Sequence, residues 1–162
     1  MASPSFHLSI PAWDLTLTRQ WYEQVLGCVA GRSSAAALIL DLGGHQLVAQ
    51  QQPHGPDPEP VQQGIYPRHF GLQFDSLPQW QALRERVEAA GEPFAVAPKC
   101  RYPGSALEHH TFFLNDPSGN WLEFKHYSHP EAVLGCREQA EVGDPELRLD
   151  SAESTSRELG NG

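Results

Sequence analysis

Residues 112–124, FFLNDPSGNWLEF, carry the strongest local signal in the sequence. Alternating apolar residues flank DPSGN at 116–120, and Asp, Pro, Ser, Gly and Asn in this order are typical of a tight turn. The stretch therefore predicts a hairpin, with one strand at about His109–Leu114 and the next at about Asn120–Tyr127.

The residues before this hairpin predict a strand, a helix and another strand. A strand over His69–Phe74 leads to a helix that is capped near Asp75 or Ser76 and stopped by Gly91. A strand at about Phe94–Cys100 follows. The predicted apolar face of the helix consists of Leu77, Trp80, Leu83 and Val87. The order is βαβββ.

The N-terminal half repeats this order. A strand over Phe6–Ile10 leads to a helix that begins after Asp14 and ends at Gly27, and Gly43-Gly44 predicts a later hairpin turn. The predicted apolar helix positions are Leu17, Trp21, Val25 and Leu26. The predicted strands are Val29–Ser33, Ala37–Leu42 and His45–Gln50. Two tandem βαβββ units predict an α+β fold, because an internal repeat constrains the fold more than any single element does.

Changes in composition along the chain predict the boundaries of the two units, the linker and the tail. Residues 53–67 contain five prolines and predict a linker between unit one (5–52) and unit two (68–127). Residues 128–162 carry eight acidic residues and three arginines with little apolar periodicity. We therefore expect one domain over 1–127, followed by an acidic, disordered tail.

The overall composition favours a small-molecule partner. The net charge of −9 argues against a nucleic-acid or anionic membrane surface, because both need an excess of Lys and Arg. No stretch approaches the roughly 20 apolar residues of a membrane span, and no signal sequence opens the chain. Three scattered cysteines do not form a disulfide framework or a zinc spacing. These features predict a cytoplasmic protein.

Strand parity brings three metal-ligating side chains to the face opposite the helices. His7 and His69 hold equivalent places in the opening strands of the two units, and Glu123 lies in the last strand of unit two. A single histidine on a strand is more often structural, so the prediction depends on the repeat. Two imidazoles and one carboxylate form a set with open coordination positions, which favours one divalent ion, first Fe(II), with Mn, Ni, Co or Zn as alternatives.

Residues 5–127 resemble the vicinal oxygen chelate superfamily of glyoxalases, bleomycin-resistance proteins and extradiol dioxygenases. The segments that carry the resemblance are FHLSIPAWDL, WYEQVLG, PRHFGLQF and FFLNDPSGNWLEF. The resemblance implies a cup-shaped mixed β-sheet with helices on its outer face, and metal chemistry on substrates that chelate through neighbouring oxygens. It also implies that His7, His69 and Glu123 are the ligands.

Two departures from the superfamily bear on the reaction. Gln46 stands where the resemblance to glyoxalase I enzymes implies a further carboxylate; its amide oxygen is a candidate fourth ligand, but an amide is no base near neutral pH. This disfavours glyoxalase-type isomerisation unless Glu123 moves the proton. Phe113 stands where extradiol dioxygenases usually carry a tyrosine, and their upstream histidine is missing.

The remaining candidates follow from parity. His109 is the predicted proton-transfer group, with a rim histidine as the alternative, and Tyr127 is the second predicted catalytic residue. Of two arginines in corresponding strands, Arg32 is expected to hold a substrate carboxylate, whereas solvent exposure is favoured for Arg101. Lys125 is expected to contact the substrate, and the alternative is that it is a solvated charge at the end of its strand. The predicted substrate contacts are Ser9, Arg32, Thr111, Phe113 and Lys125.

Three function classes follow. The first is a metal-dependent dioxygenase of extradiol type acting on adjacent substrate oxygens. The second is a glyoxalase-like lyase or isomerase, or a thiol transferase, using Ni, Zn or Mn. The third is a non-enzymatic small-molecule-binding protein. The sequence leaves open whether the two units pair within one chain or exchange between the chains of a homodimer.

Overall fold

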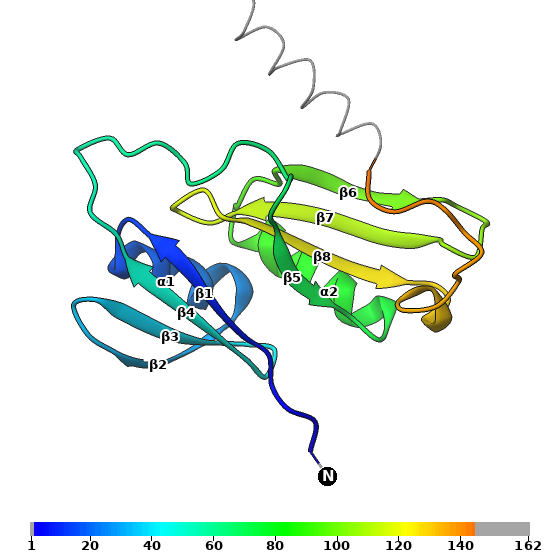
Figure 1. The fold of residues 1–162 in the computed structure, drawn as a ribbon, viewed down its shortest axis with the longest axis horizontal. Helices are drawn as coiled ribbons and strands as arrows, with labels where there is room; N and C mark the ends of the chain where they lie inside the picture. Colours follow the sequence, from blue (N-terminus) through cyan, green and yellow to red (C-terminus); the bar gives the residue numbers. More distant parts are fainter. Residues whose placement is uncertain (1, 145–162) are drawn as a thin grey trace, which may run out of the picture.

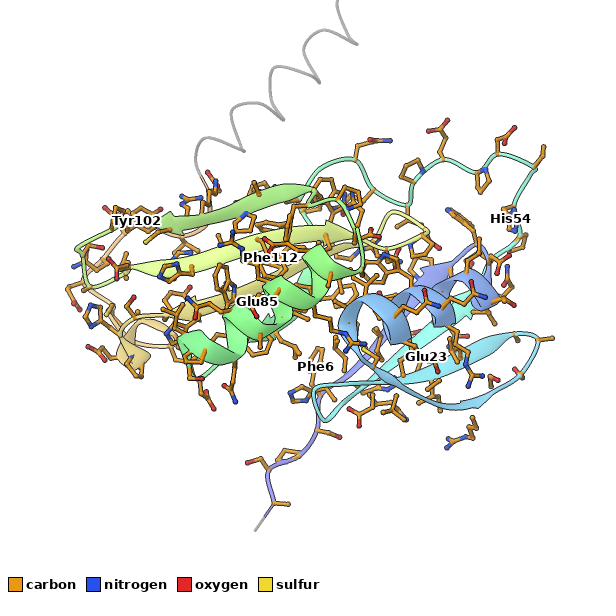
Figure 2. The ribbon with its side chains drawn as sticks, turned by 180° about the vertical axis from the view of Figure 1, so that it is seen from behind. Phe6, Glu23, His54, Glu85, Tyr102 and Phe112 are labelled. Atoms are coloured by element: carbon orange, nitrogen blue, oxygen red, sulfur yellow. The ribbon has the colours of Figure 1, made fainter. Side chains whose placement is uncertain are left out.

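The computed structural model describes residues 2–144 and confirms two tandem βαβββ units. Within these residues the strands form two four-stranded sheets, ordered β1-β4-β3-β2 and β5-β8-β7-β6. The sheets lie side by side with both helices behind them (Figure 1), and the helices stand in front in the opposite view (Figure 2). The elements are β1 (His7–Ala12), α1 (Leu15–Leu26), β2 (Val29–Ser33), β3 (Ala37–Leu42), β4 (His45–Gln51), β5 (Phe70–Gln73), α2 (Leu77–Ala89), β6 (Val96–Arg101), β7 (His109–Asn115), β8 (Trp121–Tyr127) and the 3-10 helix η1 (Pro130–Ala132).

The predicted capping residues fix the helix ends. The Asp14 carboxylate accepts a hydrogen bond of 2.8 Å from the Leu17 backbone N–H, and Gly27 adopts the left-handed conformation at φ 71° that ends α1. Ser76 caps α2 in the same way. Neither helix within residues 2–144 has the length and apolar character needed to cross a membrane.

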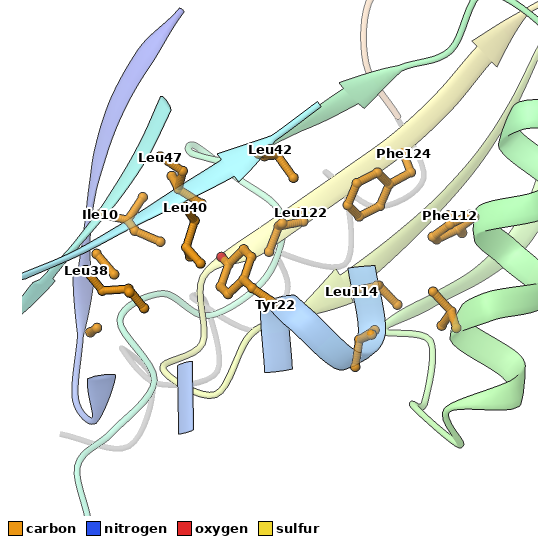
Figure 3. Close-up of a cluster of buried hydrophobic side chains, with 14 of the residues drawn as sticks. Ile10, Tyr22, Leu38, Leu40, Leu42, Leu47, Phe112, Leu114, Leu122 and Phe124 are labelled. Carbon is orange, nitrogen blue, oxygen red and sulfur yellow. The ribbon is translucent and has the colours of Figure 1, made fainter. Parts of the chain in front are cut away.

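One apolar core joins the two units behind the sheets (Figure 3). Side chains at alternate strand positions point toward the helices, so the opposite, concave faces remain for polar groups. In α1 the buried positions are Thr18, Tyr22 and Val25, whereas Leu17, predicted to face the core, is 53% exposed. The buried strand positions include Leu38, Leu40, Leu47, Phe112, Leu114, Leu122 and Phe124.

The turn between β7 and β8 is tied to the first unit through Asp116. Its buried carboxylate accepts hydrogen bonds from the Tyr22 hydroxyl at 2.9 Å and from the Asn120 side-chain amide at 2.8 Å. The same carboxylate accepts the backbone N–H groups of Ser118 and Asn120. This network positions the turn that leads into β8, and with it Glu123.

Tyr22→Phe is expected to lower the free energy of unfolding by about 2 kcal/mol, because it removes a buried hydrogen bond to a carboxylate. Chemical denaturation followed by circular dichroism measures the change. Gln20→Ala, at an exposed position of the same helix, is the control. Equal stability of Tyr22→Phe and the parent chain would contradict the role given to this bond.

The chain after β8 lies against the second sheet as far as residue 144. Residues 128–144, expected to be disordered, form η1 and return to β6, where Asp144 is buried at 4% exposure. Its carboxylate pairs with Lys99 and Arg101, which the local composition could not reveal. Residues 145–162 lie outside the described residues.

Candidate metal centre

His69 and Glu123 meet on the concave face of the second sheet. The Nε2 atom of His69 lies 3.3 Å from Oε2 of Glu123. The pairing of β5 with β8 sets this approach, since it places Gly71 directly beside Glu123. Two of the three predicted ligands therefore lie together.

Hydrogen bonds prepare both side chains for a cation. The Nδ1 atom of His69 lies 2.7 Å from the Ile65 carbonyl oxygen, which can only accept, so Nδ1 carries a proton and Nε2 is the nitrogen that faces Glu123 and could bind a cation in place of its own proton. The Thr111 hydroxyl donates to Glu123 Oε1 at 2.8 Å, and Lys125 Nζ lies 3.4 Å from Oε2. Oε1 of Glu123 is therefore oriented by the Thr111 hydroxyl, and Oε2 lies close to both the His69 ring and the Lys125 ammonium group.

The pKa values of the pair follow from these contacts. Burial opposes ionisation of Glu123, but the hydrogen bond with His69, the charge of Lys125 and the bond from Thr111 outweigh it, so the Glu123 pKa is about 2. The bond with Glu123 raises the His69 pKa, although burial acts in the opposite direction. Glu123 is thus an anion across the physiological range.

His7 lies outside this pair. Its Nδ1 is 2.7 Å from Oε1 of Gln46 on the first sheet, where His7 is exposed. Among residues 2–144, no group of three or more His, Cys, Asp or Glu is placed to hold a metal ion. The predicted meeting of His7, His69 and Glu123 does not occur within one chain.

The repeat shows which residue of unit one corresponds to Glu123. Val48 pairs with Ser9 in the parallel register in which Glu123 pairs with Gly71. Gln46 stands two positions earlier on the same face of β4, which is why it reaches His7. The first sheet therefore presents an imidazole and an amide, with an apolar side chain where the second sheet has its carboxylate.

A cavity of about 710 Å³ lies over the second sheet and contains the His69–Glu123 pair. Phe113 contacts the His69 ring at a centroid distance of 5.4 Å and is 3% exposed. Ser9 and Arg32 do not line this cavity, because both belong to the first sheet, where they are exposed. The predicted residues that do line it are His69, His109, Thr111, Phe113, Glu123, Lys125 and Tyr127.

His109 and Tyr127 lie against each other in the cavity, with ring centroids 4.7 Å apart. Burial lowers the His109 pKa, and the charge of Lys125 acts in the same direction, whereas a contact of 2.8 Å between Nδ1 and the Leu107 carbonyl opposes them. His109 is therefore a neutral imidazole at neutral pH, able to accept a proton.

Sequence reasoning missed the cavity wall formed by Arg101, Tyr66 and residues 132–144. Arg101 was expected to be solvent-exposed, but its side chain is 13% exposed. The alternation of side chains along β6 could have indicated that these cations act together, because it places Lys99 and Arg101 on one face. The acid that pairs with them lies more than forty positions later in the chain and could not be identified from local pattern.

The stability of the metal-free protein should depend on pH through His69 and Glu123. The Glu123 pKa is below its ordinary 4.5, so its stabilisation is present above pH 4.5 and is lost as the pH falls toward 2. The His69 pKa is raised above 6.5, so its stabilisation is present below pH 6.5 and is lost as the pH rises through the folded-state value. Melting temperatures across pH measure both limbs.

Glu123→Gln should flatten both limbs of this profile, because it removes one titrating group and the partner of the other. Glu85→Gln, on the exposed face of α2, should leave the profile unchanged. Identical profiles for the parent chain and Glu123→Gln would show that the pair is not coupled in solution.

Comparison with known proteins identifies the fold and the family. A comparison with curated proteins finds no match. A glyoxalase/bleomycin resistance protein/dioxygenase from Alicyclobacillus acidocaldarius is 37% identical, with a TM-score of 0.73 over 80% of this chain and 96% of that chain. Two matches at 18% identity share the fold: lactoylglutathione lyase from Agrobacterium tumefaciens (TM-score 0.57, covering 77% and 94%) and the fosfomycin resistance protein FosX from Listeria monocytogenes (0.59, covering 82% and 100%). Residues 5–124 match the family model, and the chain belongs to the Glyoxalase/Bleomycin resistance protein/Dioxygenase superfamily.

Proposed function

We propose that the chain is a metal-dependent enzyme acting on a small substrate with two adjacent oxygens, and that the reaction is an extradiol-type oxygenation. The observation that carries the proposal is the His69–Glu123 pair, with an oriented imidazole and an ionised carboxylate in one cavity. With His7 as third ligand, the donor set suits Fe(II), and Mn, Ni, Co or Zn are the other candidates. Free thiols at Cys28, Cys100 and Cys136 support a reducing, cytoplasmic location.

The third ligand would come from a second copy of the chain. Within the described residues, the cavity is lined by unit two, by the end of the linker and by residues 132–144, with no contribution from unit one. His7 and Gln46 share a sheet face with the apolar side chain of Val29, which is 70% exposed. In a symmetric dimer each first sheet would cover the partner's cavity, giving two equivalent sites.

The residues around the pair have distinct roles in this proposal. A bound Fe(II) would supply open coordination positions for the substrate oxygens and O2. Thr111 and Lys125 keep Glu123 ionised and oriented. His109 accepts the proton of a substrate hydroxyl, and Tyr127 supports its ring. Ser9 and Arg32 would contact substrate from the second copy.

The donor set favours oxygenation over the glyoxalase-like alternative. That alternative uses Ni, Zn or Mn and needs a base near the metal-bound substrate. Val48 occupies the position that corresponds to Glu123, and Gln46 offers an amide, so unit one supplies no carboxylate there. The base of that alternative would then have to come from unit two, from Glu123 itself or from His109.

Metal content and substrate range test the proposal. The full chain, purified without oxygen, should contain one iron per chain and should consume O2 with a catechol but not with a 2-oxoaldehyde or an epoxide. Nickel, zinc or manganese with turnover of the oxoaldehyde would support the lyase alternative. A metal-free protein that fails to bind any of these ions would contradict both enzymatic functions.

A mixing experiment tests the shared site. His7→Ala and Glu123→Gln each remove one ligand, and neither homodimer should bind metal tightly. A mixed dimer should regain one intact site, built from His7 of one chain and Glu123 of the other. If mixed dimers bind no more metal than either variant alone, the ligands do not come from two chains.

A further inference from the structure

Asp144 places a carboxylate against two cations, of which Arg101 lies in the wall of the cavity. Its Oδ2 lies 2.8 Å from Nζ of Lys99 and pairs with the Arg101 guanidinium. The Asp144 side chain is 6% exposed and that of Arg101 is 13% exposed, so this ion pair is largely shielded from water. A shielded guanidinium requires an anionic partner, because an unpaired charge shielded from water is strongly destabilising.

The segment that carries Asp144 has further anchors. The Asp144 backbone N–H donates to the Tyr66 hydroxyl at 2.7 Å. The Gly143 carbonyl accepts from Arg101 Nη2 at 3.2 Å and from the Tyr102 hydroxyl at 3.3 Å. Removal of the Asp144 carboxylate alone would therefore leave the segment with contacts that hold it in place.

Arg101 lines the cavity, and Lys99 lies beside it against the same carboxylate. Lys99 and Arg101 lie on one face of β6, and Arg101, Asp144 and Tyr66 line the same cavity as Glu123. A molecule in this cavity can therefore contact both the metal ligands and the Arg101 guanidinium. The planar fork of Arg101 matches a carboxylate, which is the group that it holds in this structure.

We propose that Lys99 and Arg101 form the subsite for a substrate carboxylate, and that Asp144 occupies this subsite until the substrate displaces it. The inference rests on the proposed function and deepens it, since it makes the substrate a carboxylic acid whose adjacent oxygens face Glu123. A substrate carboxylate replaces the Asp144 carboxylate charge for charge, whereas a neutral substrate would leave Asp144 in place. The apparent affinity for any competing anion is therefore the intrinsic affinity multiplied by the fraction of time that Asp144 leaves the subsite free.

Ligand binding to the metal-free full chain tests the subsite. Calorimetric titration with benzoate, and with benzamide as its neutral counterpart, separates charge from ring contacts. Asp144→Asn should bind benzoate about tenfold more tightly than the parent chain, a change of about 1.4 kcal/mol, with no gain for benzamide. Glu138→Gln removes an exposed charge from the same segment but outside the cavity lining, and should leave both affinities unchanged.

Further variants make the result decisive. Arg101→Gln in the Asp144→Asn background should abolish the gain for benzoate, and Lys99→Gln should reduce it. The proposal is overturned if folded Asp144→Asn, judged by its near-ultraviolet circular dichroism, binds benzoate no more tightly than the parent chain. It is also overturned if the gain survives Arg101→Gln, or if inorganic phosphate binds more tightly than benzoate. Because no metal is present, these outcomes are independent of the metal titration that tests the proposed function.

Discussion

Glu123→Gln is expected to weaken metal binding by at least about 100-fold while the fold stays intact. The substitution keeps the size and shape of the side chain but replaces an anion whose pKa is about 2 with a neutral amide. Lys125 would then face a neutral group that cannot balance its charge. Anaerobic titration with Fe(II), or titration with Mn(II) followed by electron paramagnetic resonance, measures the affinity, and far-ultraviolet circular dichroism reports the fold.

Glu85→Gln is the matched control, because it removes one carboxylate from the exposed surface of α2 in the same unit. His69→Ala should resemble Glu123→Gln, since it removes the other member of the pair. One metal ion bound by Glu123→Gln with the affinity of the parent chain would remove the basis of the proposed centre.

The secondary structure could be predicted from sequence because its signals are local. Asp14 and Ser76 cap the helices through hydrogen bonds within three residues, and Gly27 ends α1 because it tolerates a positive φ. The turn at 116–120 carries its own hydrogen bonds to Asp116. Each of these contacts lies within one short segment, so composition and spacing suffice to reveal it.

The spacing of apolar residues in α1 did not predict the burial of Tyr22. The sequence favoured Leu17 for the core, yet Tyr22 is fully buried and Leu17 is exposed. Burial of a tyrosine requires a partner for its hydroxyl, and that partner, Asp116, lies 94 residues away. No local pattern contains that information.

The site also combines features that strand alternation predicts with features that depend on how distant segments pack. Strand parity correctly placed His69, Thr111 and Glu123 on one face, because alternation is a property of each strand. It could not place His7 relative to them, because the distance between two sheets depends on how the units pack and assemble. The role of residues 128–144 was missed for a related reason: Asp144 is buried by cations on β6, and an acidic composition alone predicts solvation.

Gly71→Ala is expected to destabilise unit two by about 4 kcal/mol or more, and to lower the melting temperature by about 10 °C. A Cβ atom at Gly71 would lie 1.7 Å from the Glu123 backbone carbonyl oxygen and 2.7 Å from its carbonyl carbon. These are backbone atoms in a paired strand, so no side-chain rotation can relieve the overlap. Strands β5 and β8 must separate, which moves Glu123 away from His69.

Gly55→Ala provides the control, because a Cβ atom at Gly55, in the linker, meets no atom within 4 Å. The two substitutions add the same methyl group and the same loss of unfolded-chain entropy, so the difference between them isolates the contact with Glu123. Calorimetry measures the melting temperatures, and metal titration of the folded fraction measures the effect on the centre. Gly71→Ala should lose both stability and metal affinity. Equal melting temperatures for the two variants would mean that β5 and β8 do not pair closely at Gly71, and that the approach of His69 to Glu123 has another cause.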